Sequence, residues 1–318
     1  MRGMDTELRL QGSIYAVLWN NYPIMCFFIK LLNSYKIRRV MPTISGHLKK
    51  MVTQLNADTG AKIQYQMSLD DQLVDLNPLV GETIKLHYVG EIHCSHCGRK
   101  TNKSFSQGYC YPCFKKLPQC DLCIMSPEKC HYHLGTCRDS SWGDDFCMQE
   151  HFVYLANSSA LKVGITRGTQ LPTRWCDQGA TQGLPIFRVR TRLLSGLVET
   201  LFKQTLADKT NWRAMLKGEA DAIDLATIRD ELYQQYAEGI QQLELEHGPG
   251  AITHLPDAEV IELEFPVLQY PTKVSSLNFD KTAEIEGKLM GIKGQYLLLD
   301  CGVINLRKFS SYHIEFSY

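Results

Sequence analysis

Residues 94–113 read CSHCGRKTNKSFSQGYCYPC, in which Cys94, Cys97, Cys110 and Cys113 form two Cys-x2-Cys pairs separated by twelve residues. Four thiolates at this spacing can close a tetrahedron around one zinc ion, and Gly98 permits the tight turn that follows such a pair. Disulfides are one alternative and buried free thiols are another. Disulfides require a secreted chain, and nothing in the sequence indicates export, so we expect a cytoplasmic protein. The stretch predicts a structural zinc site of the zinc-ribbon kind.

A second group of cysteines follows, so that nine of the twelve in the chain lie between Cys94 and Cys147. Histidines stand among these cysteines at positions 131, 133 and 151. This density of metal-binding side chains predicts a second metal site. The preferred ligands are Cys120, Cys123, Cys130 and Cys137. Cys147 or a histidine is an alternative ligand, and an iron–sulfur cluster is an alternative to zinc.

The formal net charge of zero averages over opposed blocks of sequence. Residues 160–217 contain ten Lys or Arg and three acids, whereas residues 218–262 contain eleven acids and one Arg. A basic centre beside an acidic block is typical of a protein that meets a polyanion on one face. The alternative is that both blocks are solvated surface, and the charges alone do not separate the two interpretations.

Composition and length predict a multidomain α+β protein of ordinary globular character. Residues 1–40 are an extension of unclear role that contains no membrane helix; a mis-assigned start and an interfacial helix are both open interpretations. The predicted divisions are a small β unit at 41–92, a cysteine-rich zinc-binding module at 93–150, an α/β domain at 151–218, an acidic amphipathic helix at 219–252 and a small β-barrel-like domain at 253–318. Within the first unit, residues 61–67 and 83–89 alternate as strands do.

The α/β domain has the most regular pattern. Strands are predicted at 152–156, 161–166 and 186–193, with a helix at 172–178 that ends at Gly179, and a second helix capped by Ser195. In the third strand, the alternation of side chains places Arg188, Arg190 and Arg192 on one face, as a track for phosphates or as a solvated outer face.

Four features follow one another in this domain: Phe152-Val153-Tyr154, Lys162-Val163-Gly164-Ile165, and then Arg174 and Glu199 on successive helices. Together they resemble the GIY-YIG nuclease superfamily, most closely the branches with a Lys-Ile-Gly motif. The resemblance covers about residues 152–217. The wider arrangement looks like DUF2797, an uncharacterised bacterial family of unknown function, which implies no activity. Two departures stand out: Phe152 replaces a glycine, and Lys162 replaces the second tyrosine.

The superfamily resemblance implies roles for four residues. Tyr154 would orient or deprotonate water, Lys162 would assist it or hold the phosphate, Arg174 would stabilise phosphoryl charge, and Glu199 would bind Mg²⁺ or Mn²⁺. Tyr154 as a core residue, Glu199 as a surface carboxylate and Arg174 paired with Asp177 are the structural alternatives.

The sequence thus predicts a zinc-scaffolded, metal-dependent endonuclease that acts on DNA or RNA. The basic side chains expected to contact nucleic acid are Arg167, Arg188, Arg190, Arg192 and Arg213. The alternative is a non-catalytic, zinc-dependent nucleic-acid-binding protein that uses the same basic face, and a redox or iron–sulfur protein is a third. No membrane association is expected, and no protein partner is indicated.

Overall fold

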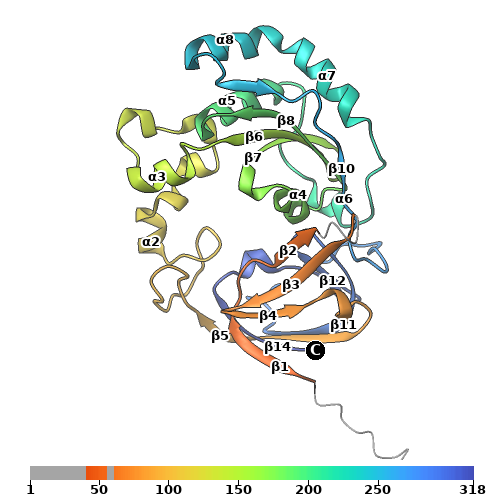
Figure 1. Cartoon of the computed structure of the whole chain (residues 1–318). Coiled ribbons are helices and arrows are strands. Elements are labelled where there is room, and N and C mark those ends of the chain that lie inside the picture. Colours follow the sequence, from red (N-terminus) through yellow and green to blue (C-terminus); the bar gives the residue numbers. More distant parts are fainter. Residues whose placement is uncertain (1–40, 56–60) are drawn as a thin grey trace, which may run out of the picture. The chain divides into compact units, whose positions relative to one another are not determined.

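Strands from both ends of the described chain form one antiparallel sheet in the computed structural model, which describes residues 41–55 and 61–318 (Figure 1). In spatial order the strands are β1 Thr43–His47, β14 Tyr312–Ser317, β5 Thr83–Ile92, β11 Glu284–Lys293, β12 Tyr296–Leu299 and β13 Gly302–Asn305. The predictions for residues 1–40 lie outside the described residues.

The order of these strands corrects the predicted division into units at 41–92 and 253–318. Strand β5 lies between β14 and β11, so both predicted units contribute to a single sheet. A strand needs a neighbour to satisfy its backbone groups, and that neighbour can come from any distance along the chain. Among the described residues the path of strands is open, with β1 and β13 at its edges, so pairing does not close the predicted barrel.

A smaller sheet of three strands lies over the same core. It consists of β2 Val52–Leu55, β3 Ile63–Leu69 and β4 Gln72–Asp75. The predicted alternation in β3 is confirmed, because Ile63, Tyr65 and Met67 are buried while the residues between them are half-buried. These side chains join the core that the six-stranded sheet also covers.

The cysteine-rich module contains little regular structure. Its elements are the helices α2 Tyr111–Lys116 and α3 Ser140–Phe146 and the single 3-10 turns Pro118–Cys120, Leu122–Ile124, Pro127–Lys129 and Tyr132–Leu134. Such short elements bury little apolar surface of their own, and modules of this kind are commonly held by bound metal.

The α/β domain follows the predicted order of strand, strand, helix, strand and helix. Its elements are β6 His151–Asn157, β7 Leu161–Arg167, α4 Thr173–Gln178, β8 Gln182–Val189 and α5 Arg192–Phe202. The sheet order is β10-β8-β6-β7, where β10 is Ile261–Glu262, and β9 Ile252–His254 also pairs with β8. Gly179 ends α4 in a left-handed conformation (φ 69°), as predicted.

Both faces of β6 are buried, in two different cores. Val153 and Leu155 face the core beneath α5 and α7, whereas Tyr154 and Ala156 belong to the core shared with the six-stranded sheet. Figure 1 shows α5, α7 and α8 on one side of this sheet and α4 on the other. The alternation of strand side chains therefore directs Tyr154 toward α4.

The predicted boundary between the third strand and the following helix is wrong. Strand β8 ends at Val189, and Arg192 begins α5. Thr191 caps this helix, because its Oγ1 accepts a hydrogen bond from the Leu194 N–H at 3.3 Å. Ser195 is buried inside the helix, and its hydroxyl donates to the carbonyl of Arg192 at 2.7 Å.

The acidic segment forms two helices rather than one, α7 Leu225–Gln235 and α8 Ala237–His247. The break falls at Tyr236, whose ring lies edge-on to Phe202 and whose hydroxyl is 3.1 Å from the Thr205 Oγ1. Packing of this tyrosine against α5 thus overrides a continuous helical pattern. The remaining elements are α6 Trp212–Met215 and the 3-10 helices Asn77–Leu79, Gly168–Gln170 and Leu306–Phe309. None of the helices in the described ranges has the length and apolar character to cross a bilayer.

Candidate metal centre and basic pocket

The four cysteines of the two predicted pairs come together at the end of β5. One sulfur atom from each of Cys94, Cys97, Cys110 and Cys113 lies within 4.8 Å of all the others. The sulfurs of Cys97 and Cys110 are 3.8 Å apart. A tetrahedral zinc site with Zn–S bonds of about 2.3 Å has sulfur–sulfur separations of about 3.8 Å. This cluster could hold one zinc ion structurally.

Local backbone geometry brings the first pair of cysteines into position. The Gly98 N–H donates to the Cys94 carbonyl at 2.8 Å, and Gly98 has a φ of 67°, which is the left-handed conformation that glycine adopts readily. The Cys94 N–H in turn donates to the Arg99 carbonyl at 2.9 Å. On the other side of the site, Cys110 directly precedes α2, which carries Cys113. Four thiolates leave no position for water or substrate, so a zinc ion bound here would be structural.

The second group of cysteines is arranged differently from the prediction. Cys123, Cys130, Cys137 and Cys147 line one small cavity. Cys120 does not line it; its thiol is hydrogen-bonded to Ser106 and lies near the first centre. In this structure Cys120 therefore lies apart from the cavity that Cys123, Cys130 and Cys137 of the predicted set line.

Four residues that the GIY-YIG resemblance singled out come from four different elements and lie close together. The Tyr154 hydroxyl on β6 donates to the Gln178 Oε1 at 3.0 Å, and the Lys162 ammonium on β7 donates to the same oxygen at 2.7 Å. Burial raises the pKa of Tyr154, and the adjacent Arg174 guanidinium on α4 opposes this rise. Glu199 on α5 contributes to the same electrostatic field. The structure thus brings Tyr154 and Lys162 together at Gln178, with Arg174 beside Tyr154 and Glu199 within electrostatic range.

Burial distinguishes this group from an open catalytic cleft. Tyr154 is 0% exposed, Lys162 is 3% exposed and Glu199 is 7% exposed. Tyr154 packs directly over Gly164, where an added Cβ would lie 2.6 Å from the phenol oxygen. Burial and the charge of Arg174 lower the pKa of Lys162 to about 8. The group is a closed polar network in this conformation.

Glu199 is held by a lysine. Its Oε2 lies 2.9 Å from the Lys203 ammonium, one helical turn further along α5, and Lys203 also lies 3.4 Å from Asp208. Burial raises the pKa of Glu199, although the ion pair with Lys203 opposes this rise. The Lys203 ammonium thus already neutralises this carboxylate, and the arrangement by itself supplies no site for Mg²⁺ or Mn²⁺ at Glu199.

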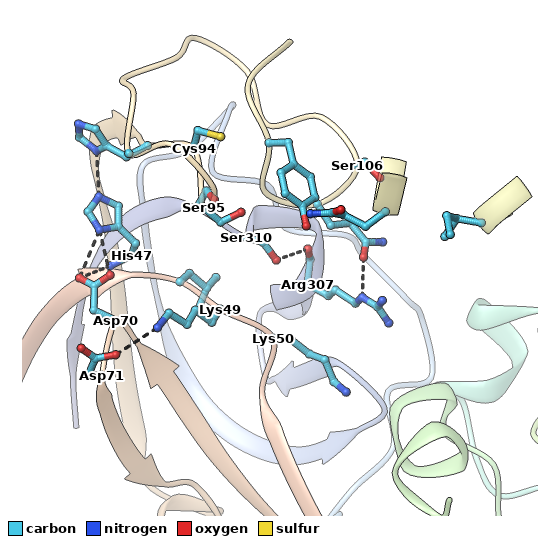
Figure 2. Close-up of a pocket in the computed structure, with 18 of the residues that line it drawn as sticks. His47, Lys49, Lys50, Asp70, Asp71, Cys94, Ser95, Ser106, Arg307 and Ser310 are labelled. Atoms are coloured by element: carbon cyan, nitrogen blue, oxygen red, sulfur yellow. Dashed lines mark hydrogen bonds and ion pairs between the residues drawn. The ribbon is translucent and has the colours of Figure 1, made fainter. Parts of the chain in front are cut away.

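Arg174 also lines a pocket of about 1200 Å³. Figure 2 shows this pocket with part of its lining labelled. Its lining comes from the loops after β1 and β3, the cysteine-rich module, α4 and the segment before β14. Its charged and polar side chains include Lys49, Lys50, Asp70, Asp71, Ser95, Tyr109, Arg174 and Arg307. Figure 2 shows Lys50 and Arg307 extending toward the same side of the pocket. Ligand pockets commonly measure about 300–1,000 Å³, so this one can take an extended ligand.

The cations of this pocket differ in how they are neutralised. Lys49 pairs with Asp71 at 3.4 Å, and Lys50 pairs with Asp177. Among the described residues, Arg174 and Arg307 have no carboxylate within ion-pair distance; Arg307 donates instead to the Gln107 amide oxygen at 2.6 Å. Burial lowers the pKa of Arg307; the charge of Asp177 opposes this effect, and the charge of Arg174 adds to it. The pocket thus holds two guanidinium groups whose charges act on each other.

The predicted arginine track does not exist. Arg188 is exposed on β8 and lies 3.6 Å from Glu150, whereas Arg190 follows the strand and donates to the Pro249 carbonyl. Arg192 begins α5, and its guanidinium donates to the Ile124 carbonyl at 2.6 Å beside the second cysteine group. The track fails because the strand ends before the second of the three arginines.

The two other predicted nucleic-acid contacts lie against aromatic rings outside the pocket. The Arg167 guanidinium carbon is 4.6 Å from the centre of the Phe146 ring, and that of Arg213 is 4.3 Å from the centre of the Trp212 ring. The sequence analysis missed Gln178, Lys50 and Arg307. A glutamine at the end of a short helix and a basic residue in a strand-rich tail carry no local signal of function.

Comparisons with known proteins identify one match. A family described as "Protein of unknown function (DUF2797)" matches residues 81–314. Comparisons with curated proteins and with solved structures found no match. The matched region includes the cysteine-rich module, the α/β domain and most of the C-terminal strands. Since it spans more than half of the 318 residues, the chain belongs to the DUF2797 family, whose function is unknown.

Proposed function

We propose that this protein binds nucleic acid through its phosphates, in the pocket that Arg174 and Arg307 line. One observation carries this proposal: two guanidinium groups share the pocket and have no carboxylate partner among the described residues. Like charges held together in a partly desolvated site raise the free energy of the unbound protein. A phosphate diester placed between them would relieve this repulsion.

The chemistry of the two arginines suits a phosphate ligand. Guanidinium groups present several N–H donors in one plane and bind phosphate oxygens in pairs. The Nε of Arg174 is buried without a hydrogen-bond partner, so this side chain has unused donor capacity. Lys50 lies in the same pocket, and its ammonium could exchange the ion pair with Asp177 for an ion pair with a bound phosphate.

The zinc ribbon forms one wall of the pocket and links zinc to binding. Cys94, Ser95 and Tyr109 all line the pocket, and Cys94 is a ligand of the first centre. The Ser95 hydroxyl donates to the Gly108 carbonyl at 2.9 Å, which joins the two cysteine pairs across the wall. Loss of zinc would therefore release this wall, so the proposed binding depends on zinc.

Fluorescence anisotropy with labelled single-stranded DNA, duplex DNA and a structured RNA tests the proposal. We expect Arg174→Ala and Arg307→Ala each to weaken binding about 10- to 100-fold, since hydrogen bonds to charged groups contribute about 1.5–3 kcal/mol. Each substitution should also make log K depend less steeply on log salt concentration, by the amount that corresponds to the loss of one phosphate contact.

Arg213→Ala is the charge-matched control, because Arg213 is exposed and does not line the pocket. We expect it to change affinity less than threefold. Equal losses for Arg213→Ala and Arg307→Ala would indicate diffuse charge attraction and contradict a pocket site. No binding by the zinc-loaded wild type to any of the three nucleic acids would refute the proposal.

Phosphodiester hydrolysis is a second candidate function. The convergence of Tyr154, Lys162, Arg174 and Glu199 from four elements favours it, because buried groups with perturbed pKa values concentrate at functional sites. Hydrolysis with a divalent cation would require Lys203 to release Glu199. Cleavage of the bound nucleic acid with Mg²⁺ or Mn²⁺ that is lost in Glu199→Gln would establish this function. Binding without cleavage under the same conditions would reject it and leave the binding proposal unchanged.

A further inference from the structure

The cavity between the four later cysteines has the size of a single ion. It measures about 10 Å³, close to the volume that one water-sized sphere needs. The thiols of Cys130 and Cys147 are hydrogen-bonded to each other, and Cys123, Cys130 and Cys147 are all at least nine-tenths buried. An iron–sulfur cluster, with its several metal and sulfide atoms, does not fit this space.

Cys137 reaches the same space from a separate loop. Its sulfur lies 3.5 Å from the position where Gly143 on α3 would carry a Cβ. Cys147 follows Gly143 by four residues, and its N–H donates to the Gly143 carbonyl at 2.7 Å, so both positions lie on the same face of the helix. The Cys137 thiol thus lies in van der Waals contact with this face of α3, where it donates to the Asp139 carbonyl at 3.3 Å.

The oxygen and nitrogen donors nearby are already engaged. Asp121, Cys123 and His131 have ligand atoms within 4.8 Å of one another. The Asp121 Oδ2 lies 2.6 Å from the Arg138 Nε, and its Oδ1 accepts from the Cys123 N–H at 3.3 Å. The two ring nitrogens of His131 lie 2.8 Å from the Thr136 Oγ1 and 3.5 Å from Asp121. These two residues therefore support the site from outside, as partners that orient a ligand do.

We propose that Cys123, Cys130, Cys137 and Cys147 hold a second zinc ion, that Cys120 is not one of its ligands, and that this centre anchors helix α5. Zinc with four thiolates carries a net charge of about −2, which favours a nearby cation. The Arg192 guanidinium lies beside three of these cysteines and donates to the Ile124 carbonyl at 2.6 Å.

Three contacts join α5 to the loop that carries the ligands. The Arg192 N–H donates to the Cys147 carbonyl at 2.8 Å, and the Arg192 side chain binds the Ile124 carbonyl. One turn further along, Gly196 packs on the backbone of the turn Pro127–Lys129, where an added Cβ would lie 2.4 Å from the Glu128 nitrogen. The metal fixes this loop between Cys123 and Cys130, and the loop fixes the start of α5.

Zinc stoichiometry of the full chain, measured by native mass spectrometry and elemental analysis, tests the ligand set. We expect two zinc ions in the wild type, one in Cys147→Ser, one in Cys137→Ser and two in Cys120→Ser. Cys97→Ser is the matched control for the first centre and should retain one ion. If Cys147→Ser does not fold, Cys137→Ser decides the matter, since Cys137 is only half-buried.

Two results would overturn this ligand set. A wild type that binds one zinc ion, still bound in Cys147→Ser, would exclude the second centre. A loss of one ion in Cys120→Ser, with two ions retained in Cys147→Ser, would place Cys120 in the site.

Hydrogen exchange tests the anchoring role separately. We expect amides of residues 192–202 to exchange at least tenfold faster in Cys137→Ser than in the wild type, and to be unchanged in Cys97→Ser. Equal exchange in all three proteins would show that α5 is held without the second ion.

Discussion

Tyr154 and Lys162 share one acceptor: the phenol and the ammonium both donate to the Gln178 Oε1, at 3.0 and 2.7 Å. A single side-chain oxygen thus satisfies two buried donors that come from the neighbouring strands β6 and β7. The Lys162 ammonium also donates to the Thr210 Oγ1 at 2.8 Å. This network holds a positive charge inside the protein, and its energetics can be measured.

The first prediction concerns the pH dependence of stability. The pKa of Lys162 is lowered to about 8 in the folded state, compared with about 10.4 when unfolded. Between these values the unfolded chain binds the proton that the folded chain has lost, so stability increases with pH. We expect the wild type to gain on the order of 3 kcal/mol relative to Lys162→Met between pH 7 and pH 10.5. Urea unfolding of both proteins across this range measures the difference.

Lys203→Met provides a control of opposite sign. Although burial opposes it, the ion pairs with Glu199 and Asp208 raise the pKa of Lys203. The stability that Lys203 contributes is therefore present below its unfolded pKa and is lost as the pH rises above it. The wild type should therefore gain no stability relative to Lys203→Met between pH 7 and pH 10, and should lose it only above about pH 10.4. If both variants differ from the wild type by the same amount at every pH, the assignment of Lys162 is wrong.

The second prediction concerns the contact between α5 and the cysteine-rich module. A Cβ at position 196 would lie 2.4 Å from the Glu128 nitrogen, and backbone cannot move away as a flexible side chain can. We expect Gly196→Ala to destabilise the protein by about 1–3 kcal/mol despite the better helix propensity of alanine. Gly218→Ala is the control, because no atom lies within 4 Å of its added Cβ. A thermal midpoint for Gly196→Ala equal to that of Gly218→Ala would contradict the close approach.

The third prediction concerns the cap of α5. The Thr191 hydroxyl accepts from the Leu194 N–H, whereas the Ser195 hydroxyl donates to a carbonyl within the helix. We therefore expect Thr191→Ala to cost about 1 kcal/mol and Ser195→Ala to cost less than half of that. Denaturant unfolding compares the two variants, and the reverse order would restore Ser195 as the cap that the sequence indicated.

The fourth prediction concerns removal of zinc. Because the first centre supports a wall of the basic pocket, we expect a strong chelator to lower the thermal midpoint and to abolish nucleic-acid binding. Addition of zinc, but not of magnesium, should restore both. An unchanged midpoint after complete loss of zinc, verified by elemental analysis, would show that the thiols are not structural ligands.

Much of the α/β domain could be predicted because its signals are local. The alternating residues of β6 and β7 and the glycine that ends α4 are read within a few positions along the chain. The pairing of β5 with β14 could not be predicted in the same way, since their partner residues lie more than 200 positions apart. No local pattern encodes the partner of a strand.

The candidate site could be predicted only where the number of residues between the cysteines is typical of ligands that bind one metal ion. Cys94, Cys97, Cys110 and Cys113 meet that condition, and they converge as predicted. Cys120 has the same Cys-x2-Cys spacing to Cys123, but its thiol is hydrogen-bonded to Ser106 and does not line the cavity that Cys123 lines. Spacing indicates which thiols can meet, and the backbone between them decides which do.

By itself, the sequence determined the first cysteine centre, the order of elements in the α/β domain and the left-handed end of α4, because each depends on neighbouring residues. The tertiary structure alone decided that Tyr154 is buried, that Lys203 holds Glu199, that Arg192 faces cysteines and that Arg174 meets Arg307. Burial and charge pairing depend on side chains contributed by distant segments. Their energies are therefore set only when those segments pack together.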